Sequence, residues 1–141
     1  MPGLFTKLTS SRAGGRRAGS WVWPTAAALV GVVSIQQAHA ADSAAGEAYF
    51  HQHCSLCHVA AKDARAITAP NLYGIGGTTS GVGAFPFSTA LKTAKIKWGA
   101  ASLDSFLADP TKAAPGTRMI TPIPNDADRA NVVAYLLSLK P

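Results

Sequence analysis

Acidic residues are missing from the start of this chain. The first 20 residues contain none, although four of the 13 Lys and Arg residues lie there: Lys7, Arg12, Arg16 and Arg17. From Ala41 onward, nine Lys and Arg stand against seven Asp and Glu, a net charge of +2 rather than the +6 of the whole chain. The positive charge therefore does not indicate binding of nucleic acid or a membrane by the part after Ala41.

Long hydrophobic runs are also missing. The apolar run Trp21 to Ile35 has 15 residues and is interrupted by Pro24, whereas a membrane-spanning helix needs about 20. A basic segment precedes the run, and Ala38-His39-Ala40 follows it with alanines at both positions of an A-x-A cleavage site. We expect residues 1–40 to be a signal peptide that is cleaved after Ala40, which leaves residues 41–141 as one domain in the periplasm.

Three alternatives for this segment remain open. The run could be a retained membrane anchor, or the Arg- and Ser-rich start could be a transit peptide. The pair Arg16-Arg17 also permits twin-arginine export. We favour general secretion of an unfolded chain and no stable membrane insertion after cleavage.

Cysteine is scarce: the chain has two, and both lie in Cys54-Ser55-Leu56-Cys57-His58. This C-x-x-C-H pattern is the signature of covalent attachment of a c-type haem. Two residues between the cysteines allow both sulfurs to reach one edge of a porphyrin, and the adjacent histidine can then ligate the iron. We therefore expect Cys54 and Cys57 to bind one haem c covalently and His58 to be an axial ligand.

Other chemistry is possible at this motif. The exported compartment would permit a structural disulfide. A thioredoxin-like redox pair is conceivable, but no βαβ pattern surrounds the motif. A zinc site would need more ligands than the two cysteines, and only His51, His53 and His58 lie near. A chance match is the last alternative.

Methionine is scarce too, and Met119 is the one methionine after residue 40. His51 and His53 directly precede Cys54, on the chain that enters the histidine side of the haem, so we expect both on the surface. Met119 follows the turn Pro115-Gly116 and is remote in sequence, which makes it our candidate for the second axial ligand; the alternative is a methionine that fills a gap in the core. Coordination by His and Met suits electron transfer rather than oxygen binding.

The pattern from residue 41 onward predicts short helices and long loops. Pro70 lies in one of these loops, and its carbonyl is a candidate acceptor for the second ring N–H of His58, because haem-ligating histidines normally donate that proton; an ordinary turn proline is the alternative. Helices are expected over residues 41–53, 89–94 and 102–108, with Ser102 as the cap of the third. A last helix is expected after Asn125, which should cap it.

These residues together resemble the class I c-type cytochromes, the mitochondrial-type and related bacterial monohaem proteins, along residues 42–139. Apart from the haem motif, each matching segment is weak evidence when taken alone. The resemblance rests on the order and spacing of all the matching segments together. The matching segments are Gly46-x-x-x-Phe50, Cys54-x-x-Cys57-His58, Pro70-Asn71-Leu72-x-Gly74, Phe85-x-Phe87-Ser88, Trp98, Leu107-x-x-Pro110, Pro115-Gly116-Thr117-x-Met119 and Ala134-Tyr135-Leu136.

The resemblance implies an all-α cytochrome c fold, in which short helices and long loops wrap around one haem and the first and last helices cross at Gly46. The haem pocket that it implies contains Pro70, Ser88, Trp98 and Thr117. Four positions depart from the mitochondrial-type pattern, where a tyrosine, an arginine, an asparagine and a tyrosine are usual: Phe87, Thr78, Leu91 and Phe106.

We expect a monomer that carries one electron at a time and catalyses no reaction of its own. Its partners would be a cytochrome bc complex, a haem-copper oxidase or a periplasmic dehydrogenase. The alternatives are a dedicated haem subunit of one dehydrogenase or oxidase complex, a haem peroxidase or sensor with a labile sixth ligand, and a haem-free disulfide module.

Overall fold

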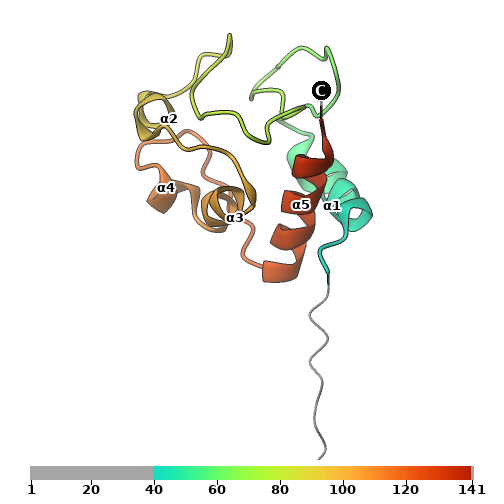
Figure 1. Ribbon diagram of the computed structural model, residues 1–141. Coiled ribbons are helices and arrows are strands. Elements are labelled where there is room, and N and C mark those ends of the chain that lie inside the picture. Colours follow the sequence, from blue (N-terminus) through green and yellow to red (C-terminus); the bar gives the residue numbers. More distant parts are fainter. Residues whose placement is uncertain (1–39, 141) are drawn as a thin grey trace, which may run out of the picture. The chain divides into compact units, whose positions relative to one another are not determined.

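Residues 40–140 are described by the structure, a computed structural model, and they consist of short helices joined by long loops (Figure 1). The elements are α1 (Ser43–Tyr49), the π-helical segment η1 (Phe50–Cys54), α2 (Thr89–Ala94), α3 (Ala100–Ala108), α4 (Pro110–Ala113) and α5 (Asp126–Ser138). Within these residues the only β-type pairing is a bridge between Thr79 and Lys97. The expected all-α fold is therefore confirmed.

The signal peptide expected over residues 1–40 lies outside the described residues, apart from Ala40. Among the helices that the structure does describe, none has the length and apolar character needed to cross a membrane.

The first helix begins at Ser43 because Asp42 caps it. One carboxylate oxygen of Asp42 accepts the backbone N–H groups of Ala44, at 2.8 Å, and Ala45, at 3.3 Å. The helix then widens into η1, so that helical backbone continues to Cys54. Such widened turns are rare in helices and are frequent at functional sites.

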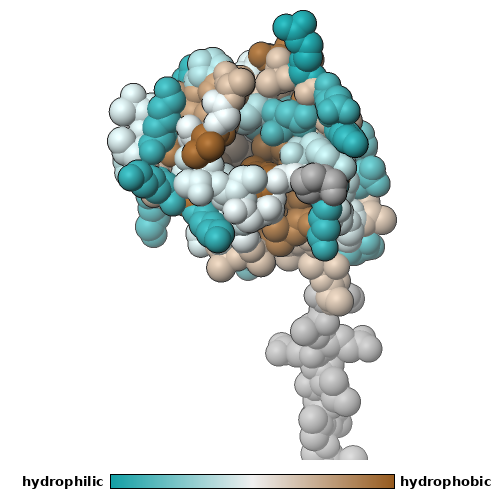
Figure 2. Space-filling model, turned by 45° about the horizontal axis from the view of Figure 1, so that its top comes forward, coloured by the Kyte–Doolittle hydropathy of each residue, from teal (hydrophilic) through white to brown (hydrophobic). Residues whose placement is uncertain are grey.

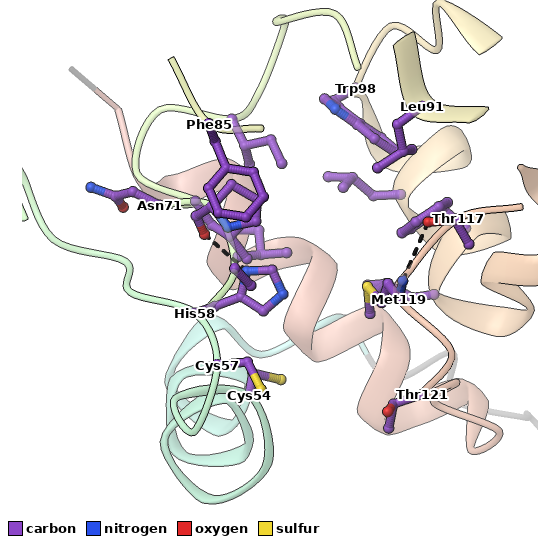
Figure 3. Close-up of a pocket in the computed structure, with 18 of the residues that line it drawn as sticks. Cys54, Cys57, His58, Asn71, Phe85, Leu91, Trp98, Thr117, Met119 and Thr121 are labelled. Carbon is purple, nitrogen blue, oxygen red and sulfur yellow. Dashed lines mark hydrogen bonds between the residues drawn. The ribbon is translucent and has the colours of Figure 1, made fainter. Parts of the chain in front are cut away.

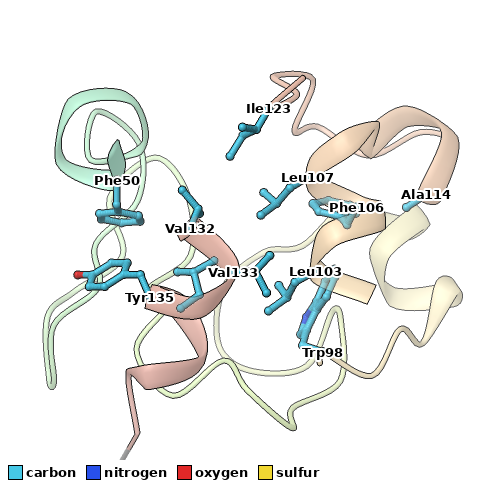
Figure 4. Packing of buried hydrophobic residues seen from close by; sticks show 11 residues of the cluster. Phe50, Trp98, Leu103, Phe106, Leu107, Ala114, Ile123, Val132, Val133 and Tyr135 are labelled. Atoms are coloured by element: carbon cyan, nitrogen blue, oxygen red, sulfur yellow. The ribbon is translucent and has the colours of Figure 1, made fainter. Parts of the chain in front are cut away.

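Helices α1 and α5 lie side by side and make the most extensive contact between elements (Figure 1). Gly46 permits this, because a Cβ at this position would overlap the Asn131 carbonyl and lie 2.9 Å from the Cβ of Tyr135. One turn on, the rings of Phe50 and Tyr135 pack with their centroids 5.5 Å apart (Figure 4). The crossing at Gly46 is therefore confirmed.

The core lies between α5 and α3 (Figure 4). Asn125 caps α5 by accepting the Asp128 N–H at 2.9 Å, as the sequence predicts. The buried residues that α5 and α3 contribute are Val132, Val133, Tyr135, Leu136, Leu103, Phe106 and Leu107. This core fixes one wall of the site described below.

Two details differ from the sequence prediction. Ser102 does not cap α3: the helix begins at Ala100 after Gly99, and the Ser102 hydroxyl accepts the Gly99 N–H at 2.8 Å from inside the first turn. The short helix α4 was not predicted. Asp109 caps it by accepting the Lys112 N–H at 3.0 Å, and Pro110 occupies its first turn, where a missing N–H costs nothing.

Candidate functional site: a cavity between the cysteine motif and the methionine loop

A cavity of about 680 Å³ lies between α5, α3 and the long loops. Figure 2 shows its mouth as a hollow with apolar residues inside. All eight residues that the sequence singled out line this one cavity: Cys54, Cys57, His58, Pro70, Ser88, Trp98, Thr117 and Met119. Segments more than 60 residues apart in the chain are thus brought to one site.

The two cysteines stand on the turn that ends η1. The backbone N–H groups of Cys57 and His58 both donate to the Cys54 carbonyl, at 3.1 and 2.9 Å, which places the motif in a tight turn. Cys54 is half-buried and Cys57 is exposed. As long as Cys54 is a free thiol, burial and then the neighbouring Cys57 raise its pKa above the ordinary value.

The imidazole of His58 is held in one tautomer. Its Nδ1 lies 2.9 Å from the Pro70 carbonyl oxygen, and a carbonyl can only accept, so Nδ1 carries the proton and Nε2 the free lone pair. Burial lowers the pKa of His58, and the hydrogen bond to Pro70 opposes this shift. A neutral imidazole with a free Nε2 is the form that ligates a metal.

Met119 lies across the cavity from His58 and the cysteines (Figure 3). It is half-buried and packs against the core cluster. Thr117, which is buried, donates its N–H to the Ala114 carbonyl at 2.9 Å, and its hydroxyl accepts the Met119 N–H at 3.4 Å. The cavity thus presents a thioether on one wall and an imidazole on the other.

Ser88 and Trp98 also line the cavity. The Ser88 hydroxyl accepts the Leu91 N–H at 3.3 Å and so caps α2. Trp98 is buried and packs edge-on against Phe106, with ring centroids 5.1 Å apart. Besides Leu91 and Phe106, the other two residues that depart from the mitochondrial-type pattern, Phe87 and Thr78, also line the cavity.

Two polar residues that support the loops of the site were missed. Ser80 is buried; its hydroxyl donates to the Leu91 carbonyl and accepts the Ile96 N–H, both at 2.8 Å, and so ties the glycine-rich loop to α2. Asn71 donates to the carbonyls of Ala61 and Ala64, both at 2.9 Å. Because Asn71 directly follows Pro70, the sequence could have indicated that it supports the site. In contrast, nothing in the glycine-rich sequence around Ser80 indicates that this serine has a structural role.

A third residue that was missed is Arg129 of α5. Its guanidinium donates to Asp104 at 2.7 Å, to Asp126 at 2.8 Å and to the Ile123 carbonyl at 3.0 Å. It therefore joins α5 to α3 and to the end of the segment that carries Met119.

The lining suits a large, flat and mostly apolar group. Two adjacent thiols could hold such a group covalently at one edge, and an imidazole and a thioether face it from opposite walls. Among residues 40–140 there is no cluster of three or more His, Cys, Asp or Glu side chains that could hold a metal ion alone. The donor set therefore fits a haem and not a bare zinc ion.

The chain is similar in sequence and in structure to known cytochromes. The family model described as cytochrome c matches residues 43–140. Cytochrome c of Gossypium barbadense is 38% identical over 105 residues, which cover 73% of this chain and 95% of that protein. Cytochrome c-type cyt cy of Rhodobacter capsulatus is 41% identical over 100 residues, 70% of this chain and 49% of that protein. The solved structure of cytochrome cH from Methylobacterium extorquens superimposes with a TM-score of 0.63 at 36% identity, covering 69% of this chain and 98% of that one.

Proposed function

The chain belongs to the cytochrome c family, and from this premise we propose that it carries single electrons in the periplasm, with His58 and Met119 as the two axial ligands of its haem. Membership of the family establishes the coarser statement: the protein binds one haem c covalently and is an electron carrier. The haem supplies the one-electron redox centre. The chain supplies the ligands, the orientation and the exclusion of water.

One observation carries the assignment of the ligands. His58 and Met119 face one cavity from opposite walls, and Cys54 and Cys57 lie beside His58 (Figure 3). A histidine with Nδ1 bonded to Pro70 has Nε2 free for iron. A thioether from Met119 would raise the reduction potential of the bound haem, which suits electron transfer.

The remaining pocket residues have supporting roles in this proposal. Pro70 orients the imidazole of His58, because a second-shell acceptor fixes both tautomer and ring direction. Thr117 holds the backbone of Met119. Ser88 and Trp98 line the part of the cavity that we assign to a haem propionate.

The periplasmic location and the partners are also proposals. The A-x-A site before Ala41 supports export. A cytochrome bc complex, a haem-copper oxidase or a periplasmic dehydrogenase would be the partners of a monomeric carrier. The net charge of +2 after residue 40 favours weak encounters over tight electrostatic docking.

Two measurements on the purified protein test this function. A redox titration should follow a one-electron curve, and carbon monoxide should bind slowly or not at all to the reduced protein at neutral pH. Rapid carbon monoxide binding together with a high-spin spectrum would instead support a peroxidase or sensor. A pull-down from native membranes separates a free carrier from a dedicated subunit, which would remain with one complex at all salt concentrations.

A further inference from the structure

Basic residues gather on α2 and on the segment directly after it. Lys92, Lys95 and Lys97 follow one another closely in the chain, and all three side chains are exposed. No Asp or Glu occurs anywhere in residues 64–103. Within residues 40–140, no ion pair involves any of these three lysines. Their positive charge is therefore not balanced by a neighbouring carboxylate.

The backbone that carries these lysines is held in place. The Ser80 N–H donates to the Ile96 carbonyl, and the Ser80 hydroxyl accepts the Ile96 N–H, both at 2.8 Å. Lys95 ends α2 in the left-handed conformation, with φ of 48°, which turns the chain out of the helix. Lys97 then pairs with Thr79 in the β-type bridge. The three lysines thus start from a fixed backbone, and their side chains extend into solvent.

The cavity is lined by other residues of the same region. Ser88, Leu91 and Trp98 line it, whereas none of the three lysines does. Figure 2 shows strongly hydrophilic side chains at the left of the hollow, the side on which Figure 1 places α2. The lysines therefore lie on the outer side of this wall, and a molecule bound to them does not need to cover the cavity.

Acidic residues gather in another part of the fold. Asp42 caps α1, Glu47 lies within α1, and Asp126 and Asp128 form the first turn of α5, which packs against α1. Figure 1 shows α2 at one side of the domain and α1 at the other. The net charge of +2 thus conceals a separation of charge, and such a separation orients a protein in the field of a charged partner.

We propose that Lys92, Lys95 and Lys97 form a docking surface, the basic surface, for a protein that presents an acidic patch. A membrane fits these residues less well, because segments that bind anionic lipids usually carry about four to eight Lys and Arg or add apolar residues that insert. The basic surface has three lysines, and no exposed large apolar side chain lies in residues 89–98. The inference goes beyond the proposed function, because this binding does not depend on which residues ligate the iron.

The experiment compares three haem-loaded mature proteins: wild type, Lys92→Gln/Lys95→Asn/Lys97→Gln and the control Lys62→Gln/Arg65→Gln/Lys140→Gln. Both triple variants lose three positive charges, and the control residues are exposed and lie outside the cavity lining. Asparagine replaces Lys95 because it tolerates the left-handed conformation. The probe is poly-L-glutamate, titrated at about 10 mM ionic strength, where the Debye length is about 30 Å, and followed by amide NMR of the reduced protein.

In wild type, poly-L-glutamate should shift the amide signals of residues 92–97 and leave those of residues 56–57 and 119–120, beside the cavity, unchanged. The variant without the three lysines should bind about tenfold more weakly or less, because the local charge is lost, and the control should stay within about threefold of wild type. At about 1 M salt, where the Debye length is about 3 Å, binding should disappear in all three proteins.

Equal weakening in the two triple variants would overturn the inference, because net charge rather than the basic surface would then determine binding. Signal shifts confined to residues 56–57 and 119–120 would also overturn it. So would binding of wild type to phosphatidylglycerol vesicles without binding to poly-L-glutamate, since the partner would then be a membrane. If the triple variant does not retain its haem spectrum, Lys92→Glu alone, at an exposed position of α2, gives the same test and should weaken binding by about threefold or more.

Discussion

Nδ1 of His58 and the carbonyl oxygen of Pro70 lie 2.9 Å apart, and this one contact decides the tautomer of the histidine. The proton on Nδ1 should therefore be protected from exchange in the haem-loaded protein, where NMR can observe it. Pro70→Ala keeps the carbonyl but releases the backbone, and it should lower the free energy of unfolding by about 0.5–1 kcal/mol. Fast exchange of the Nδ1 proton in wild type would contradict this account of His58.

Gly46→Ala should destabilise the fold. In an exposed helix this change would stabilise by about 1 kcal/mol, but here the new Cβ overlaps the Asn131 carbonyl. Forcing a methyl group into such a contact typically costs about 1–3 kcal/mol. Denaturant unfolding measures the change, and Ala48→Gly, at an exposed position of α1, controls for helix propensity alone. Stabilisation by Gly46→Ala would show that α1 and α5 do not cross there.

Much of this arrangement could be predicted because its signals are local. Two cysteines at fixed spacing with an adjacent histidine define a haem motif by themselves, and Met119 stood out because it is the one methionine after residue 40. Asn125 was recognised as a cap because the acidic residues Asp126 and Asp128 follow it, at the expected start of the helix. These inferences need only neighbours in sequence.

What was missed depends on contacts between distant segments. Ser102 looks like a cap, but its hydroxyl also donates to the Lys97 carbonyl at 2.7 Å, and the helix starts earlier. Ser80 and Arg129 find their partners only when the loops and helices have packed. Nothing in the sequence around Arg118 indicates that its guanidinium donates to the Pro86 carbonyl, because 32 residues separate the two.

Asp109 should contribute stability that depends on pH. Its hydrogen bonds to the Lys112 N–H and the Thr111 hydroxyl lower the pKa of the carboxyl below its ordinary value. A group whose pKa is lower in the folded state stabilises that state above the unfolded pKa of about 3.9. The contribution disappears as the pH falls further, through the folded pKa.

Asp109→Asn keeps a capping oxygen but does not titrate. The difference in unfolding free energy between wild type and this variant should be constant above about pH 5 and shrink below pH 4. Denaturant unfolding at several pH values measures it. If the difference in unfolding free energy grew as the pH falls, the pH dependence would have the opposite sign to the one predicted. The Asp109 carboxylate would then be excluded as a stabilising cap.

Arg129→Met should lower the free energy of unfolding by about 1–3 kcal/mol, because the guanidinium is mostly buried and its loss leaves the Asp104 carboxylate and the Ile123 carbonyl without their donor. Asp126→Asn is the matched comparison. Asp126 is exposed, so the loss should stay below about 1 kcal/mol. Equal losses in both variants, measured by thermal or denaturant unfolding, would show that the bonds to Asp104 and Ile123 contribute nothing.

The most direct test of the central assignment, that His58 and Met119 hold the haem iron, is the visible and far-red spectrum of the oxidised protein. The account predicts the weak far-red band of methionine ligation in wild type. It also predicts that Met119→Leu, which keeps a similar volume but removes the sulfur, loses the band and lowers the midpoint potential. A wild-type protein without the band, or a Met119→Leu protein that retains it, would contradict the assignment.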